Sequence, residues 1–251
     1  MQRLVGLVRR CAEDYDMIQS GDRIGVGVSG GKDSLALLVL LAELRKYNHR
    51  SFDLEAITID LGFGMDFSSV ENLCRELDVP FTLVSTQIAP VIFEYRQEKN
   101  PCSMCAKMRR GALNQTLLER GLNKLALGHH YDDAVETFMM SLLYEGRISC
   151  FQPVTDLDRT GIIQIRPMLY IHEQTVDHFV TRQNLPVIQN RCPIDKRTKR
   201  EEIKKLVYEL SGKYPDLKER IFGAMQRFPL PEWEPHGRYK RPKDEMLPPE
   251  A

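Results

Sequence analysis

The sequence predicts a doubly wound α/β fold, in which helices cover both faces of a parallel sheet. Short runs rich in β-branched residues alternate with helical segments of ten or more residues, which is typical of right-handed strand–helix–strand crossovers. The first run, residues 24–28, ends in a Gly-Gly turn and leads at once into a strongly apolar segment, 34–47. Because ligands of such sheets bind at the carboxyl ends of the strands, we expect the functional residues on that rim.

The elements follow from hydrophobic periodicity and turn residues. Leu4, Leu7, Val8 and Cys11 recur at helical spacing, so residues 1–20 are expected to form a helix that covers a sheet edge or joins the contact of a homodimer. The expected strands are 24–28, 54–60, 81–85, 124–128 and 162–166, with an extended stretch at 185–189. The other expected helices are 34–47, 67–77, 102–120, a segment ending near 144, 172–183, 199–211 and 215–227.

Three stretches are less regular. Residues 86–100 end at Pro101, which stops any preceding helix, and residues 145–161 are rich in turns. From Pro229 onward, proline and charged residues dominate, so 229–251 are expected to form an irregular tail. Residues 21–228 are then one α/β domain between the first helix and this tail.

Composition restricts the location and the partners of the protein. Lysine and arginine number 35, as do aspartate and glutamate, so an RNA-binding surface would have to be a local patch. Arg9 and Arg10 interrupt the apolar start too early for a signal peptide, and no apolar run approaches the roughly 18 residues of a membrane span. We therefore expect a cytoplasmic protein without membrane contact, whose six cysteines serve metal binding or redox chemistry more than disulfides.

The turn Ser29-Gly30-Gly31 and the helix start after it form an expected anion site. A glycine pair lets the backbone approach a ligand closely, and a helix N-terminus presents unpaired N–H groups. Lys32 adds a positive charge, while Ser29 and Ser34 add hydroxyl groups. The pattern lacks the spacing of a Walker A loop, but it predicts a phosphate or pyrophosphate ligand. The alternative is a serine-capped turn without a ligand.

A second polar cluster, residues 128–133, follows the strand 124–128. Asp132 and Asp133 supply hard oxygen ligands of the kind that Mg²⁺ prefers when it bridges to nucleotide phosphates. The alternative is a capping box, with Asp133 as N-cap and Glu136 three residues later. Of the two histidines, His129 is expected to orient a ligand, and His130 receives no role.

Cys102 and Cys105 form a C-x-x-C pair at a helix N-terminus, where thiolate is favoured. The pair alone fits a redox dithiol, half of a zinc site or part of an iron–sulfur site. A zinc ribbon needs a second pair, which is missing. Cys192 is the expected third ligand, and three thiols can hold three corners of a 4Fe–4S cluster and leave the fourth iron open. The remaining cysteines are expected to be small buried residues: Cys11, Cys74 and Cys150.

Basic residues near the cysteines predict a rim that binds RNA, with a solvated helix face as the alternative. They are Lys107, Arg109, Arg110, Arg191, Lys196, Arg197, Lys199, Arg200, Lys204 and Lys205.

Together the segments 29–34, 102–111 and 128–137 and the lone Cys192 resemble the tRNA 2-thiocytidine-forming sulfurtransferases of the PP-loop ATP pyrophosphatase superfamily. The order and spacing agree over about residues 20–210. One departure is Pro193-Ile194-Asp195, where the family pattern has a further cysteine soon after the third.

The resemblance implies an enzyme that splits ATP into AMP and pyrophosphate, adenylates the C2 oxygen of a pyrimidine and then transfers sulfur to C2. The implied substrate is a cytidine in the tRNA anticodon loop, the cofactors are ATP, Mg²⁺ and a 4Fe–4S cluster, and the sulfur donor is a cysteine desulfurase or sulfide. Asp33 either orients the nucleophile or positions the metal. The implied ATP contacts are Ser29, Gly30, Gly31, Lys32, Asp33, Ser34, Asp60, Gly128 and His129.

Other functions remain open for this sequence. A tRNA 2-thiouridine synthase would share the adenylation chemistry, and an adenylating amide ligase would share the fold without needing the three cysteines. A protein that binds a nucleotide or a cluster without catalysis would release no pyrophosphate.

Overall fold

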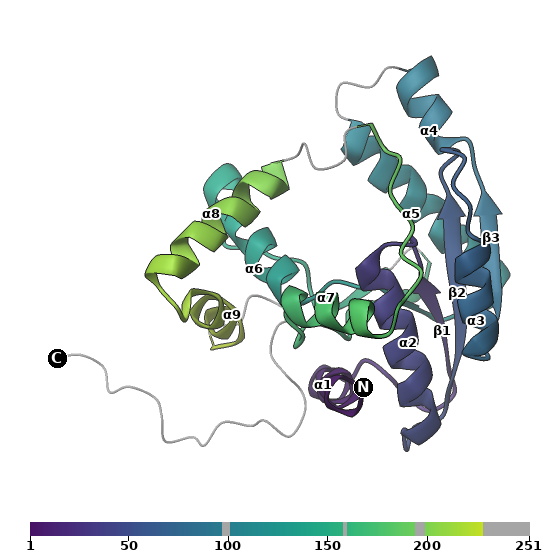
Figure 1. The fold of residues 1–251 in the computed structure, drawn as a ribbon, viewed down its shortest axis with the longest axis horizontal. Coiled ribbons are helices and arrows are strands. Elements are labelled where there is room, and N and C mark those ends of the chain that lie inside the picture. Colours follow the sequence, from purple (N-terminus) through teal and green to yellow (C-terminus); the bar gives the residue numbers. More distant parts are fainter. Residues whose placement is uncertain (97–100, 158–159, 194–198, 228–251) are drawn as a thin grey trace.

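The computed structural model describes residues 1–251 except 97–100, 158–159, 194–198 and 228–251 (Figure 1). Its described strands form one six-stranded sheet in the order β3-β2-β1-β4-β6-β5. Strands β1 to β4 and β6 run parallel, and β5 is an antiparallel edge strand beside β6. The strands are β1 Asp22–Gly27, β2 Phe52–Asp60, β3 Phe81–Ser85, β4 Lys124–Ala126, β5 Val154–Leu157 and β6 Ile162–Ile165.

Helices cover both faces of the sheet, so the predicted doubly wound fold is confirmed (Figure 1). The larger core surrounds α2, in which every residue from Leu35 to Ala42 is buried. The smaller core joins β2 and β4 to α5 on the opposite face, through residues such as Ile57, Leu117 and Leu125. The helices are α1 Gln2–Asp14, α2 Lys32–Tyr47, α3 Ser68–Glu76, α4 Ile88–Pro90, η1 Val91–Tyr95, α5 Pro101–Glu119, α6 Tyr131–Met140, η2 Ser141–Glu145, α7 Glu173–Arg182, α8 Lys199–Lys213 and α9 Leu217–Arg227.

Two segments were wrongly expected to be irregular. Residues 154–157 form β5, and residues 88–95 form the short helices α4 and η1. Both are short elements whose pairing or packing partners lie elsewhere: β5 pairs with β6, and Ile92 is fully buried in the smaller core. Elements of three to five residues carry too little periodicity to be recognised without those partners. The expected tail, 229–251, lies outside the described residues.

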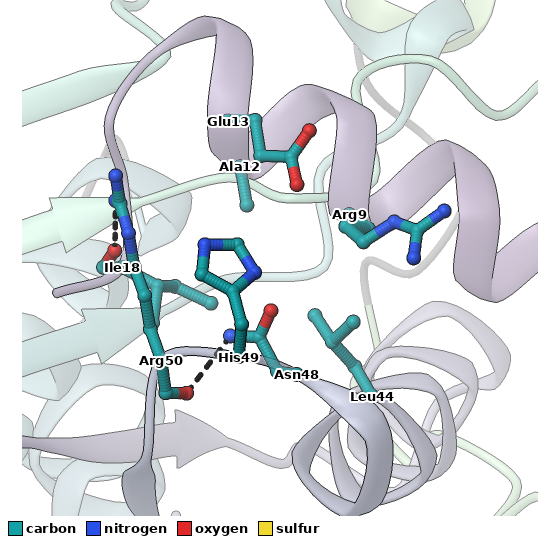
Figure 2. A pocket seen from close by; sticks show the side chains of 8 residues that line it. All are labelled: Arg9, Ala12, Glu13, Ile18, Leu44, Asn48, His49 and Arg50. Atoms are coloured by element: carbon teal, nitrogen blue, oxygen red, sulfur yellow. Dashed lines mark hydrogen bonds between the residues drawn. The ribbon is translucent and has the colours of Figure 1, made fainter. Parts of the chain in front are cut away.

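None of the described helices combines the length and apolarity needed to cross a bilayer. Figure 2 shows a notch between α1 and the end of α2, around His49 and Arg50. Its volume is about 10 Å³, close to the minimum for one water molecule, so it is no site for a cofactor.

Candidate active site

A cavity of about 630 Å³ opens at the carboxyl ends of β1, β2 and β4, within the size range of small-molecule sites. Most of the expected site residues line it, although they come from segments far apart in the sequence. These are Ser29, Gly31, Asp33, Ser34, Cys102, Cys105, Gly128, His129, Asp133 and Cys192. Gly30, Lys32, Asp60 and Asp132 are not among the lining residues.

The turn after β1 is held in shape by its two serines. Ser34 Oγ donates to Gly31 O at 2.9 Å and accepts from Ser29 N at 3.1 Å, while Gly31 N donates to Ser29 Oγ. Gly30 has a φ of +81°, a conformation that glycine adopts without strain. Helix α2 starts at Gly31 without a side-chain cap, so its first turn can present N–H groups to an anion.

Two glycines allow neighbouring segments to approach this turn. A Cβ at Gly128 would lie 2.9 Å from Asp33 O, so the residue after β4 touches the first turn of α2 backbone to backbone. A Cβ at Gly30 would lie 3.0 Å from Ile188, whose N–H donates to Gly30 O at 2.9 Å. The segment leading to Cys192 is therefore fixed against the phosphate turn.

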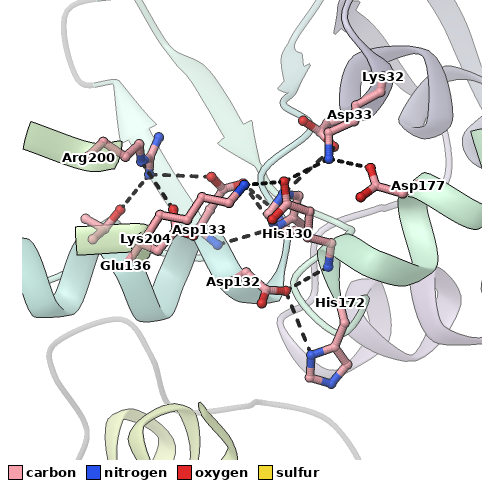
Figure 3. A network of polar contacts seen from close by, with 12 residues as sticks. Lys32, Asp33, His130, Asp132, Asp133, Glu136, His172, Asp177, Arg200 and Lys204 are labelled. Atoms are coloured by element: carbon pink, nitrogen blue, oxygen red, sulfur yellow. Dashed lines mark hydrogen bonds and ion pairs between the residues drawn. The ribbon is translucent and has the colours of Figure 1, made fainter. Parts of the chain in front are cut away.

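The side chain of Lys32 points toward α7 and away from the cavity (Figure 3). Its ammonium donates to Glu173 Oε1 at 2.9 Å and to Asp177 Oδ1 at 2.6 Å. Burial lowers the pKa of Lys32, but these hydrogen bonds outweigh it and raise the pKa overall. In this arrangement Lys32 links α2 to α7, and its contact with a phosphate stays a prediction.

Asp33 lies at the cavity wall with one oxygen, Oδ1, that is buried and has no hydrogen-bond partner in the described part of the chain. Burial raises the pKa of this carboxyl, and the nearby His130 and Lys32 lower it in part. His130 Nε2 lies 3.8 Å from Oδ1. His130 Nδ1 accepts a hydrogen bond from Asp133 N, so Nε2 is the ring nitrogen that faces Asp33. Oδ1 of Asp33 is thus an acceptor with capacity for a ligand.

The start of α6 is capped by a different pair from the one predicted. His130 is the N-cap and Asp133 is the third residue of the capping box, so the alternative with Asp133 as N-cap and Glu136 as its partner is wrong. The imidazole of His130 reaches the N–H of Asp133 because the chain leaves β4 in an extended conformation. The sequence did not predict His130 as the N-cap, because histidine is not among the preferred N-cap residues.

The two aspartates of this turn face different surroundings (Figure 3). Asp132 is buried and accepts hydrogen bonds from Glu173 N, at 2.7 Å, and from the Lys218 ammonium. Burial raises the pKa of Asp132, but those hydrogen bonds hold it below its usual range. Asp133 lines the cavity, with Arg200 Nη2 3.5 Å from its Oδ1. Asp133 is therefore the better placed of the two for a metal ion at the phosphates.

His129 contributes a neutral imidazole to the cavity wall. Burial, followed by the charge of Arg166, lowers its pKa to about 4, and its Nδ1 has no hydrogen-bond partner among the described residues. Phe151 packs against both side chains: its ring centre lies 4.8 Å from that of His129, and the Arg166 guanidinium lies 5.0 Å above it. The imidazole is thus oriented by packing and keeps one nitrogen for a ligand.

The three expected thiols line the same cavity although Cys192 lies 87 residues after Cys105. Burial raises the pKa of Cys105, the charge of Arg109 lowers it, and the charges of Cys192 and Cys102 raise it again. No three His, Cys, Asp or Glu side chains of the described chain converge on one point as the ligands of a single ion would. An iron–sulfur cluster is wider than one ion, so thiols arranged around a cavity fit its ligand set.

The other three cysteines do not line the cavity. Cys11 and Cys74 are buried as predicted, and Cys150 is half-buried and donates to Ala134 O. Burial raises the pKa of Cys74 to about 11 and that of Cys150 to about 12, so neither is a reactive thiolate.

The wall near β2 is apolar and supplies a surface for a flat ring system. Ile57, Ile59, Leu61 and Phe63 line it, whereas Asp60 lies outside the lining and accepts from Gly62 N at 2.9 Å. The contact between Asp60 and a ribose or adenine therefore remains a prediction that this geometry does not support.

Some residues that shape the site carry no recognisable sequence signal. Glu173 joins Lys32 of α2 to Lys204 of α8, and burial, outweighed by these two hydrogen bonds, leaves its pKa at about 2. Arg166 is buried at the end of β6, and its hydrogen bonds go to Gln152 O, Thr155 and Gln164. Single charged residues in such segments are common on protein surfaces, so only the tertiary contacts reveal them.

Comparison with known proteins bears on this site. A family model described as a PP-loop domain matches residues 6–210. The tRNA-cytidine(32) 2-sulfurtransferase of Pelobacter propionicus is 37% identical over 228 residues, which cover 89% of this chain and 85% of that protein. That of Nitrosomonas eutropha is 34% identical over 241 residues, covering 95% and 77%. Among solved structures, the U34-tRNA thiolase NcsA of Methanococcus maripaludis with its 4Fe-4S cluster gives a TM-score of 0.71 at 25% identity, covering 86% of this chain and 75% of that one.

Proposed function

Since the chain belongs to the tRNA-cytidine 2-sulfurtransferase family of PP-loop proteins, we propose that it is an ATP-dependent enzyme that converts a cytidine of the tRNA anticodon loop into 2-thiocytidine. One observation carries this proposal. The phosphate turn, the buried Asp33 oxygen and the thiols of Cys102, Cys105 and Cys192 line a single cavity. A nucleotide, a reacting base and a source of sulfur can thus meet in one place.

The reaction requires two displacements in that cavity. The C2 oxygen of the cytosine attacks the α-phosphorus of ATP, and pyrophosphate leaves with the electron pair of the broken P–O bond. A sulfur nucleophile then attacks C2, and AMP leaves with the former C2 oxygen. Adenylation is needed because a carbonyl oxygen is a poor leaving group, whereas AMP is a good one.

The phosphates are bound by the turn between β1 and α2. The hydroxyls of Ser29 and Ser34 hold the turn in shape, and the first-turn N–H groups that follow the N-cap Gly31 would bind the phosphates at the positive end of α2. Asp133 is the carboxylate at the cavity that would hold Mg²⁺ against the phosphates, while Asp132 is already engaged by Lys218 and Glu173 N.

Arg109 supplies positive charge to the cavity that the phosphate turn and the thiols share. It is the one lysine or arginine among the described residues that line the cavity, because Lys32 points to α7. A guanidinium offsets charge on a phosphate or a thiolate without losing its own proton. Arg109 therefore stabilises the negative charge that develops on the departing phosphate groups.

Cys102, Cys105 and Cys192 are the residues that would hold a 4Fe–4S cluster. When bound, such a cluster supplies an iron at which the incoming sulfur is held. The sulfur comes from a cysteine desulfurase or from free sulfide. The enzyme works as a homodimer. Its compartment is the cytoplasm, where thiols remain reduced.

Asp33 accepts a hydrogen bond from the base during the first displacement. Attack by the C2 oxygen leaves positive charge on the cytosine ring, and the exocyclic amine then becomes a stronger donor. The buried Oδ1 of Asp33 makes no hydrogen bond to any described residue, although Lys32 Nζ lies 3.6 Å away, so it can receive that hydrogen bond and stabilise the charge.

Two measurements test the function. Anaerobically purified protein is incubated with labelled ATP, sulfide and unmodified tRNA, and the products are expected to be AMP, pyrophosphate and 2-thiocytidine, with Asp33→Asn forming none. ADP and phosphate as products would contradict the adenylation. Mass spectrometry of tRNA nucleosides from a strain without the gene is expected to show loss of 2-thiocytidine, whereas loss of a 2-thiouridine instead would show that the substrate base is uridine.

A further inference from the structure

One segment of the chain, residues 185–192, contacts the phosphate turn and carries one of the three thiols. It follows α7, passes the start of α2 and ends beside α5 (Figure 1). Ile188, Asn190 and Cys192 line the cavity, whereas Val187 and Arg191 do not. Lining by alternate residues is typical of an extended chain, whose successive side chains point to opposite sides. The segment therefore forms one wall of the cavity.

The first contact of this segment is with the phosphate turn. The N–H of Ile188 donates to Gly30 O at 2.9 Å. A Cβ at Gly30 would lie 3.0 Å from both Cβ and Cδ1 of Ile188, so the side chain packs directly on the glycine. Ile188 also packs against the larger core. The shape of the turn and the position of Ile188 therefore depend on each other.

The second contact is with the loop after β2. Arg191 Nη1 donates to Gly64 O at 2.8 Å, and Gly64 follows Phe63, which belongs to the apolar wall of the cavity. The N–H of Cys192 donates to Asn190 Oδ1 at 3.1 Å. The residue directly before the thiol is thus held against the part of the cavity that would bind a nucleotide.

The basic residues expected around the cavity do not all add charge to it. Arg200 Nη2 lies 3.5 Å from Asp133, and Lys204 donates to Glu173 at 2.6 Å, so both are paired with carboxylates (Figure 3). Two others lie outside the described residues, namely Lys196 and Arg197.

Electrostatics within the cavity opposes the simultaneous binding of a nucleotide and a cluster. Asp33, Asp133 and Glu201 line it, and Arg109 is the one lysine or arginine among its described lining residues. A cluster held by three thiolates adds negative charge, so through charge alone it would weaken the binding of ATP. Salt screens such repulsion between solvated groups. A contact through residues 185–192 acts at short range and is much less sensitive to salt.

We propose that residues 185–192, through Ile188 and Arg191, make the binding of ATP and the binding of the cluster mutually favourable. This inference rests on the proposed function, which assigns both groups to the cavity. A cluster bound by Cys192 fixes the end of the segment, and phosphates bound at the turn fix the contact between Gly30 and Ile188. Each ligand thus favours the arrangement that the other requires, and by linkage each raises the affinity of the other by the same factor.

The test compares the full-length protein with a reconstituted cluster and without iron. The Kd of ATP is measured anaerobically for both forms by calorimetry in the absence of tRNA, and the loss of iron to a chelator is followed with and without ATP. The double variant Ile188→Ala, Arg191→Met removes the packing on Gly30 and the hydrogen bond to Gly64. The matched control Val187→Ala, Arg220→Met changes a neighbouring side chain that is 48% exposed and an arginine whose ion pair lies within α9.

ATP is expected to bind about tenfold more tightly to the cluster-containing form of the wild type and of the control, as is usual for coupled sites. ATP should also slow the loss of iron from both proteins, and higher salt should not reduce the ratio of the two Kd values. In the double variant the ratio should fall to one or below, because the contacts are removed and the repulsion remains. The ratio is decisive, since the loss of a direct contact with ATP would change both forms alike.

Several results would overturn the inference. Equal ATP affinity in the two wild-type forms, weaker binding by the cluster-containing form, or a wild-type ratio in the double variant would each refute it and leave the proposed function intact. If the double variant loads no cluster, the comparison passes to Arg191→Met, which leaves the cavity lining unchanged; its ratio should lie below that of the wild type, and an unchanged ratio would refute the inference. A wild-type protein that binds no cluster would contradict the proposed function itself.

Discussion

Replacing Gly128 with alanine is expected to weaken ATP binding through the contact between β4 and α2. The φ of Gly128 lies outside the left-handed region, so an alanine can adopt the backbone conformation and only the added methyl group matters. Its Cβ would lie 2.9 Å from Asp33 O, 3.0 Å from Asp33 C and 3.1 Å from Ser34 N. These are backbone atoms of the first turn of α2, which cannot rotate away as a side chain would.

The magnitude follows from the cost of overfilling a tightly packed contact, about 1–3 kcal/mol. If the turn shifts to relieve the overlap, Asp33 and Ser34 move away from the phosphate site, and the free energy of ATP binding becomes less favourable. A loss of about 1–3 kcal/mol corresponds to ATP binding about 5- to 150-fold weaker. If the turn does not yield, the same cost lowers the free energy of unfolding instead.

The assay is ATP titration by calorimetry together with urea unfolding, with Gly212→Ala as the matched control. A Cβ at Gly212, in α8, meets no atom within 4 Å, so that variant should bind ATP normally and gain up to about 1 kcal/mol of stability from the better helix propensity of alanine. A Gly128→Ala protein with wild-type ATP affinity and wild-type stability would refute the reasoning that this close approach shapes the phosphate site.

Three further outcomes are expected. Lys32→Met should lower the free energy of unfolding by only about 1 kcal/mol, because the ion pairs of Lys32 with α7 are partly exposed. The same variant should change ATP affinity less than about twofold in calorimetric titration, because the Lys32 ammonium is engaged by α7. A tenfold loss of ATP affinity would instead show that Lys32 binds a phosphate. Burial, then the charge of Asp133, raises the pKa of Glu136 from an ordinary 4.5 to about 7, so ionisation of this carboxyl destabilises the wild type as the pH rises through that window. In urea unfolding, Glu136→Gln should be more stable than the wild type by about 3 kcal/mol at pH 8 and nearly equal to it at pH 4.5. Equal stability of the two proteins at both pH values would show that the carboxyl ionises freely. Cys192→Ala should lose bound iron and its visible absorbance under anaerobic purification while Cys74→Ala retains both, and a full complement of iron in Cys192→Ala would remove Cys192 from the ligand set.

Short sequence patterns predicted most of the helices and strands of this molecule, because these elements depend on interactions between residues that are close in the sequence. A β-branched run, a Gly-Gly turn and an apolar helix made the phosphate turn recognisable, and α2 differs from its expected range only at its first two residues. The C-x-x-C pair likewise lies in the first turns of α5, as its position after Pro101 indicated. Such features depend on residues within one or two turns of each other, so no knowledge of distant contacts is needed to find them.

The direction of charged side chains could not be obtained in this way. Lys32 and Asp132 sit in the motifs that identified the site, yet they are engaged by Asp177 and Lys218, which lie 145 and 86 residues further along the chain. A long side chain can reach several partners, and the choice between them depends on which segments the fold brings near. The same reason explains why Arg200 and Lys204 turn inward while the cations of α5 remain exposed.

The fold class, the phosphate turn and the candidate thiols could be recognised from the residues alone, because they depend on hydrophobic periodicity, on glycine at a tight turn and on residue chemistry. The folded molecule was needed to show that Cys192 shares a cavity with Cys102 and Cys105, and that the buried oxygen of Asp33 belongs to the same wall. Parallel strands align their carboxyl ends only after the helices between them have packed, so a site assembled from several crossovers exists only in the folded sheet.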